Sequence, residues 1–299
     1  MWNPLFKTYA RVMILSTALV AYSTSSMAAV DAMHLKAHLQ MMDKIAKGTG
    51  ESRAMGTEGG QITAEYIDDY LADENLTLVG LPFTTQQGQR DESILVTVAG
   101  QSSQDVVLIG THYDSAPKRA GLNDNASGVA VLLELIQYYA KAENKPQYNL
   151  SFIFWDGHHA DFIGSRALAK ELRLEEFGNV HAYIDIDAVA SPKPTVNIVT
   201  TAANRHAKDA WLAQQWTNFF KAKNIAVQID TRALAKTDAA AFARKLPVVG
   251  LTFTNLDAQK ADGCSKAKCD QLSELDINSM QLAAEALQYL IAQLQQAKP

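Results

Sequence analysis

Apolar and polar residues occur along the chain in blocks of different length. Residues 106–110 (VVLIG) and 150–155 (LSFIFW) are almost continuously apolar, which is typical of strands buried on both faces of a parallel sheet. The long apolar segment 126–142 between them has the length of a helix. The same criteria predict helices at about 34–47, 63–71, 126–142, 165–173, 209–221 and 277–295, and strands at about 77–84, 94–98, 106–110, 150–155, 182–188, 196–199 and 248–253.

This alternation of buried strands and helices indicates the fold class. It predicts an α/β domain of three layers, in which helices flank a mostly parallel mixed sheet. Thr63 stands at the start of the second helical segment and is expected to cap it. In sheets of this kind, ligand sites lie at the carboxyl ends of the strands. The polar residues that directly follow the apolar runs are therefore the first candidates for a functional site.

The first 28 residues have the pattern of a secretory signal. Lys7 and Arg11 give a basic start, an apolar run follows, and Ser26 and Ala28 are small residues suited to a cleavage site. The apolar run is well short of the roughly 20 residues that a membrane span requires. We therefore expect an exported protein, periplasmic or secreted, with residues 29–299 as a single domain and no membrane attachment after the signal is removed.

Charge and cysteine content narrow the possible partners. The chain has 27 Lys and Arg against 32 Asp and Glu, and its formal net charge of −5 gives no basic footprint for nucleic acid. Its basic residues are spread out, which also argues against an anionic membrane surface. Cys264 and Cys269 lie close together and are expected to form a disulfide in an oxidising compartment, with two free thiols as the alternative.

Three polar clusters follow buried segments. His112 and Asp114 lie two residues apart after an apolar run, so they face the same side of an extended chain, and Asp114 would orient the His112 ring. Asn123, Asp124 and Asn125 precede a long helix, where capping explains one such residue better than three. Asp187 ends another strand. The remaining histidines lack a carboxylate motif beside them and are expected at the surface: His34, His38, His181 and His206.

The segments GTHYDS (110–115) and GLNDNASG (121–128), followed by FIFW and a Gly-Ser pair, resemble the two-zinc aminopeptidase family. That family includes secreted bacterial aminopeptidases, glutamate carboxypeptidases and the peptidase-like ectodomain of the transferrin receptor. The resemblance covers nearly all of the mature chain. It implies a zinc-aminopeptidase fold, hydrolysis of amino-terminal peptide bonds, and a peptide or amino-terminal amide as the substrate or ligand.

The resemblance also assigns roles to residues. His112 and Asp187 would bind the first metal, Asp124 would bridge two metals, and Asp114 would hold His112. His112, Asp124 and Asp187 together give one nitrogen and two carboxylates, the ligand count of a catalytic zinc. We therefore expect one zinc per chain.

The chain departs from the family at the second metal and at the base. Where the family has two adjacent glutamates, a general base and a ligand of the second metal, this chain has His158 and His159. Ala239 stands in place of a pocket histidine. Lys266 stands in place of the last ligand histidine, and its ammonium either lies near Asp124, replacing the charge of the second metal, or points into solvent.

These departures leave two functions open. The first is an exported zinc exopeptidase in which His158, with an unperturbed pKa near 6.5, serves as the base. The second is an inactive pseudopeptidase that binds a peptide, a metal or a protein. The metal site has an alternative as well, in which His159 joins His112, Asp124 and Asp187 in one closed site with four ligands.

Overall fold

The computed structural model describes residues 30–72, 76–171, 177–192, 194–201, 206–254 and 270–296. The secretory signal, the Cys264–Cys269 disulfide and the placement of Lys266 fall outside these ranges, so all three stay predictions. None of the described helices combines the length and apolar composition that a membrane crossing requires.

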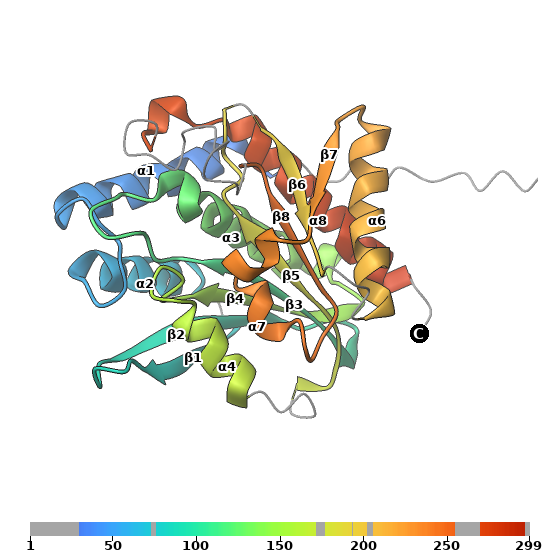
Figure 1. The fold of residues 1–299 in the computed structure, drawn as a ribbon, viewed down its shortest axis with the longest axis horizontal. Helices are drawn as coiled ribbons and strands as arrows, with labels where there is room; N and C mark the ends of the chain where they lie inside the picture. Colours follow the sequence, from blue (N-terminus) through green and yellow to red (C-terminus); the bar gives the residue numbers. More distant parts are fainter. Residues whose placement is uncertain are drawn as a thin grey trace, which may run out of the picture.

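An eight-stranded mixed sheet forms the centre of the fold (Figure 1). Its strands are β1 (Leu76–Thr84), β2 (Arg90–Val98), β3 (Ser102–His112), β4 (Tyr148–Trp155), β5 (Asn179–Asp187), β6 (Val196–Val199), β7 (Val227–Asp230) and β8 (Val248–Thr252). They lie in the order β1-β2-β4-β3-β5-β8-β6-β7. The central strands β4, β3, β5 and β8 run parallel, whereas β2 and β6 join them antiparallel. The carboxyl ends of the four central strands therefore meet at one edge.

Helices cover both faces of the sheet, as the three-layer prediction requires (Figure 1). The larger core contains residues of α1 (Ala32–Gly48), α2 (Glu58–Tyr70), α3 (Ser127–Ala140), α6 (Ala207–Ala222) and α8 (Ile277–Gln296). The smaller core contains residues of α4 (Ile163–Glu171) and α7 (Ala239–Phe242). Along β3, Val107 and Ile109 belong to the larger core, and Val106 and Leu108 to the smaller one. This alternation explains why β3 is apolar at successive positions.

The predicted cap of α2 is wrong. Thr57 caps this helix, because its hydroxyl accepts a hydrogen bond from the Gly60 N–H at 3.2 Å. Thr63 lies inside the helix and donates to the Gly59 carbonyl at 2.7 Å. Two glycines in the first turn lower the helix propensity there and hid the true start. Gly59 is required by packing, since a Cβ at this position would lie 1.9 Å from the carbonyl oxygen of Ser52.

The expected surface position of His38 is also wrong, because His38 is only 2% exposed. Its Nδ1 lies 2.6 Å from the Tyr66 hydroxyl, and its Nε2 lies 3.0 Å from the Glu134 carboxylate. Glu134 also accepts from Tyr70 at 2.7 Å and lies 3.1 Å from Nδ1 of the exposed His34. No local pattern predicts this cluster, because its members come from three different helices.

Glu134 should make the stability of the protein fall at acidic pH. Burial opposes its ionisation, but hydrogen bonds from His38, Tyr70 and His34 lower its pKa from 4.5 to about 2. A depressed carboxyl pKa stabilises the fold above the unfolded pKa, and this stability is lost as the pH falls toward the folded value. From pH 7 to pH 3 the loss is about 2 kcal/mol.

Urea unfolding of wild type and Glu134→Gln at these two pH values measures this contribution. The wild type should lose about 2 kcal/mol more than the variant. The exposed Glu143 offers a matched control, and Glu143→Gln should follow the wild type. Equal losses in wild type and Glu134→Gln would contradict the prediction.

Candidate metal site

The candidate site is built at the carboxyl edge of three neighbouring strands. His112 ends β3 and pairs in register with Trp155, the last residue of β4. Asp187 ends β5, on the other side of β3. Because these strands are parallel, the chain delivers His112, Asp187 and the turn after Trp155 to the same place, as predicted from their position after apolar runs.

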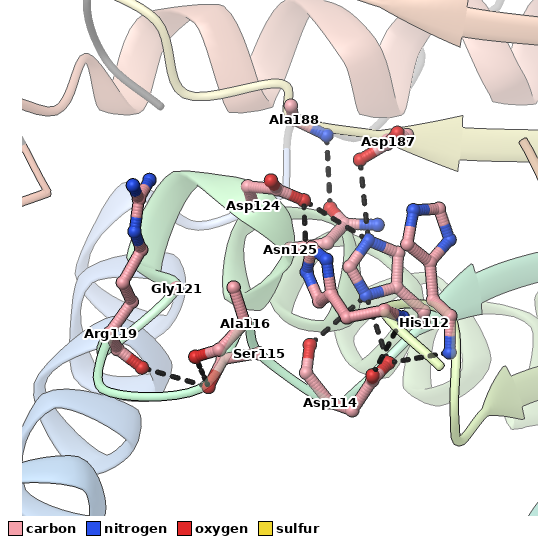
Figure 2. A network of polar contacts seen from close by, with 12 residues as sticks. His112, Asp114, Ser115, Ala116, Arg119, Gly121, Asp124, Asn125, Asp187 and Ala188 are labelled. Carbon is pink, nitrogen blue, oxygen red and sulfur yellow. Dashed lines mark hydrogen bonds and ion pairs between the residues drawn. The ribbon is translucent and has the colours of Figure 1, made fainter. Parts of the chain in front are cut away.

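The His112 ring lies between carboxylates on both sides (Figure 2). Its Nδ1 is 3.0 Å from the main-chain oxygen of Asp114 and 3.2 Å from its Oδ1. Its Nε2 is 3.2 Å from Asp124 Oδ1 and 3.6 Å from Asp187 Oδ1. The ring is 1% exposed, and neither its Nε2 nor Asp187 Oδ1 has a hydrogen-bond partner. Buried polar atoms are rarely left without a partner, so these two atoms point to a missing cation.

Asp114 does more than orient His112. Its Oδ1 accepts from the backbone N–H of His158 at 3.2 Å, and its Oδ2 accepts from that of His159 at 3.1 Å. One buried carboxylate thus fixes both the His112 ring and the turn that carries the histidine pair. The predicted role of Asp114 is compatible with this placement, and the contact with the turn adds to it.

The three polar residues before α3, Asn123, Asp124 and Asn125, make different contacts. The Asn123 carbonyl Oδ1 accepts from the Ala190 N–H at 2.8 Å, and that of Asn125 accepts from the Ala188 N–H at 3.0 Å. Both asparagines are buried and attach their loop to the segment after β5. Asp124 lies between them and turns its carboxylate to His112 (Figure 2).

Two residues that sequence reasoning did not single out hold this loop. Arg53 is fully buried and donates to the carbonyls of Tyr113, Ala120 and Gly121, the last two at 2.8 Å. Burial lowers its pKa to about 10 against the opposing effect of nearby carboxylates, so the guanidinium stays charged at neutral pH. Asp270 accepts from the Gly121 and Leu122 N–H groups, both at 2.6 Å.

The histidine pair that replaces the two expected glutamates points into the site. The His158 ring stacks on His112 with centroids 3.8 Å apart. Its Nδ1 lies 2.7 Å from Asp238 Oδ2, a carboxylate that is 2% exposed. Ala239, which stands in place of a histidine, is fully buried in the smaller core, and its methyl group can make no polar contact. The neighbouring Asp238 is therefore the residue of this segment that reaches the site.

His159 approaches from the more open side. Its Nε2 lies 3.8 Å from Asp124 Oδ1, and its ring meets His112 edge to face with centroids 5.2 Å apart. Its side chain is 21% exposed. The four-ligand arrangement, which needs His159 beside the Asp124 carboxylate, is compatible with this placement.

The donor atoms suit zinc, but among the described residues no single group holds both Asp124 and Asp187. Among the described residues, two overlapping groups have ligand atoms close enough to share a metal: His112, Asp124 and His159, and His112, His158 and Asp187. Two ligands of a tetrahedral zinc with bonds of about 2.0–2.2 Å lie roughly 3.3–3.6 Å apart. His112 Nε2 lies 3.2 Å from Asp124 Oδ1 and 3.6 Å from Asp187 Oδ1, and His159 Nε2 lies 3.8 Å from Asp124 Oδ1. These separations are close to that spacing.

The charges around His112 favour a cation as well. Burial alone would lower the pKa of His112, but Asp114, Asp124 and Asp187 outweigh this effect and raise it well above 6.5. Burial would raise the pKa of Asp124, and His112 and His159 instead lower it. Without a metal the carboxylates thus retain a proton on the imidazole, so protons and a dication compete for the same position.

The chain is similar to known peptidases in sequence and in fold. The model of peptidase family M28 matches residues 93–291. Leupeptin-inactivating enzyme 1 of Streptomyces exfoliatus is 27% identical over 273 residues, which are 86% of this chain and 60% of that protein. A probable lipoprotein aminopeptidase of Mycobacterium tuberculosis is 36% identical over 120 residues, 40% of this chain and 23% of that protein. The chain thus spans less than two thirds of the length of these relatives.

Solved structures show the same fold. The aminopeptidase LapA of Legionella pneumophila has a TM-score of 0.75 at 14% identity and covers 90% of this chain and 73% of its own. A zinc-dependent exopeptidase from Parabacteroides distasonis has a TM-score of 0.71 at 14% identity, covering 90% and 99%. A glutaminyl cyclase from an Acidobacteriales bacterium has a TM-score of 0.73 at 19% identity, covering 92% and 98%.

Proposed function

Because the chain belongs to peptidase family M28, we propose that it is a one-zinc exopeptidase of the aminopeptidase type. The observation that carries this proposal is the pair of buried, unpartnered atoms, His112 Nε2 and Asp187 Oδ1, which face each other at 3.6 Å. His112, Asp124 and Asp187 would hold the metal and leave the fourth position of a catalytic zinc open. The relatives of aminopeptidase type support a peptide with a free amino terminus as the substrate.

The chain supplies its own base in this proposal. With a proton on Nδ1, His158 donates to Asp238, which leaves the Nε2 lone pair free. Nε2 takes a proton from the attacking water and returns it to the leaving amine. When bound, zinc supplies Lewis-acid polarisation of the substrate carbonyl. Asp114 keeps His158 in place through its backbone N–H.

Metal content and hydrolysis together test this function. Elemental analysis of protein purified without chelator should give one zinc per chain, and the protein should cleave aminoacyl-p-nitroanilides. A chelator should remove both the zinc and the activity, and added zinc should restore them. Protein that takes up no zinc even after soaking would contradict the proposal.

The position of His159 favours a second candidate, a binding module without turnover. Its Nε2 lies 3.8 Å from Asp124 Oδ1, and a fourth protein ligand closes the open position that a catalytic zinc keeps. One zinc per chain with no hydrolysis of any aminoacyl substrate, before or after metal addition, would select this candidate.

We also propose that the protein is exported. The basic, apolar and small-residue order of the first 28 residues supports this, and one relative is described as a lipoprotein. The intact mass of protein recovered from the periplasm or medium should correspond to a chain that starts at Ala29. Full-length protein confined to the cytoplasm would rule out export.

A further inference from the structure

A second cavity, of about 710 Å³, lies between α2 and the β1–β2 hairpin. It shares no lining residue with the candidate metal site. Tyr113 and Asp156 line it together with residues of α2 and β2. Its lining carries six carboxylates against a single basic residue, the exposed Arg90: Glu58, Glu65, Asp68, Asp91, Glu92 and Asp156.

Asp156 sets this cavity apart from an ordinary acidic surface. The residue is 1% exposed, and its Oδ1 has no hydrogen-bond partner. A hydrogen bond joins its carboxyl to that of Asp91, and burial, with the nearby Asp114 and Asp91, raises the pKa of Asp156 to about 9. Asp91 is itself fixed, because its Oδ2 accepts from the Gly56 N–H at 3.1 Å and its Oδ1 from the Glu92 N–H at 3.0 Å. Asp156 is therefore a protonated acid at neutral pH, and a bound cation with hydrogen-bond donors would take the place of its proton.

The size and the spacing of the acids indicate which kind of cation fits. Within the described part of the chain, the two groups of three metal-ligating side chains both lie at the His112 site and none lies in this cavity. The volume is that of a site for a small organic molecule. A guanidinium or ammonium group offers several N–H donors that two adjacent carboxylates can accept, and an attached alkyl chain would lie along the cavity toward the acids of α2.

We propose that this cavity binds an organic cation, an alkylguanidinium or alkylammonium, with Asp156 and Asp91 as the partners of its charged group. Such a group belongs to free polyamines and agmatine, and equally to arginine and lysine side chains of a peptide. The proposal stands on this cavity alone and is independent of turnover at the metal site.

Calorimetric titration of the chelator-treated mature protein tests the proposal without any contribution from hydrolysis. The probes are agmatine, spermidine, the peptide Gly-Gly-Arg-Gly, calcium chloride, and N-butylurea as a neutral analogue of agmatine. Agmatine should bind at least about tenfold more tightly than N-butylurea. Gly-Gly-Arg-Gly binding about tenfold or more above agmatine would identify a peptide side chain as the natural source, whereas equal or weaker binding would identify a free cation.

Variants connect the binding to the cavity. Asp156→Asn should weaken agmatine binding by about tenfold or more, whereas Asp161→Asn, on the same loop but outside this cavity, should leave it unchanged. Glu65 and Asp68 are exposed on α2, so the double variant Glu65→Gln/Asp68→Asn should fold normally and still bind several-fold more weakly. Arg90→Gln should bind agmatine at least as tightly as wild type, because it removes the competing positive charge.

Three outcomes would overturn the proposal. These are no measurable heat with agmatine, spermidine or the peptide, equal binding of agmatine by wild type and both acidic-site variants, and binding of calcium in place of the organic cations. Loss of zinc or of hydrolysis at the His112 site changes none of these readouts, so the two proposals fail separately.

Discussion

Replacing His112 with alanine is expected to abolish zinc binding and, with it, any hydrolysis. His112 belongs to both groups of residues that can share a metal, and its Nε2 is the atom nearest to the Asp124 and Asp187 carboxylates. Without it, the Asp124 and Asp187 carboxylates lose the nitrogen ligand that lies near both of them. We expect zinc affinity to fall by about a thousandfold, roughly 4 kcal/mol, and hydrolysis at limiting zinc to fall in proportion.

Zinc titration against a competing chelator measures this loss. His34 is an exposed histidine that pairs with Glu134 and belongs to neither group of metal-binding residues. His34→Ala should therefore keep the wild-type affinity. Circular dichroism should show that the variant is folded, since its loop is still held by Arg53 and Asp270. Stoichiometric zinc in His112→Ala would mean that the metal binds elsewhere.

Related variants separate the two possible ligand groups. Removal of His159 should weaken zinc if Asp124 and His159 are ligands, whereas removal of His158 should weaken it if the other group holds the metal. A site that uses His112, Asp124, Asp187 and His159 predicts that only the former variant loses zinc. The same zinc titration therefore decides which histidine of the pair is a ligand.

The sequence predicted the framework of the fold because the framework depends on local patterns. Buried parallel strands are apolar at every position, and long helices show their period over several turns. β7 and α7 span only four residues each, too few for a period to appear, whereas the equally short β6 was found because it is buried throughout. The first turn of α2 was missed because its two glycines, which close contacts with the Ser52 and Ala54 carbonyls require, disguise a helix start.

The same distinction holds at the site. His112, Asp124 and Asp187 could be found because each follows or precedes an element visible in the sequence. The contacts that hold them are distant along the chain: Arg53 reaches Ala120 across 67 residues, and Asp270 reaches Gly121 across 149. Asp238 lies 80 residues from His158. No spacing rule links such pairs, so only the folded structure shows them.

The pairing of His158 with Asp238 leads to the second large prediction, a loss of turnover without a loss of metal. If His158 is the base, His158→Ala should lower kcat by about 10²–10⁴, the range for removal of general acid–base help. Zinc content should stay at one per chain. Asp238→Asn should cause a smaller loss, because the amide still contacts Nδ1 but no longer stabilises a positive charge on the ring.

Steady-state hydrolysis of an aminoacyl-p-nitroanilide, measured with zinc content on the same samples, tests this prediction. His206 is half-buried, contacts the backbone carbonyl of Ala243 and belongs to neither group of metal-binding residues, so His206→Ala is a matched control that should keep wild-type kcat. His158→Glu introduces the carboxylate that the resemblance implies at this position and should recover part or all of the activity lost in His158→Ala. A His158→Ala protein that turns over as fast as wild type would show that His158 is not the base. If His158→Ala instead loses zinc together with activity, His158 is a metal ligand rather than the base.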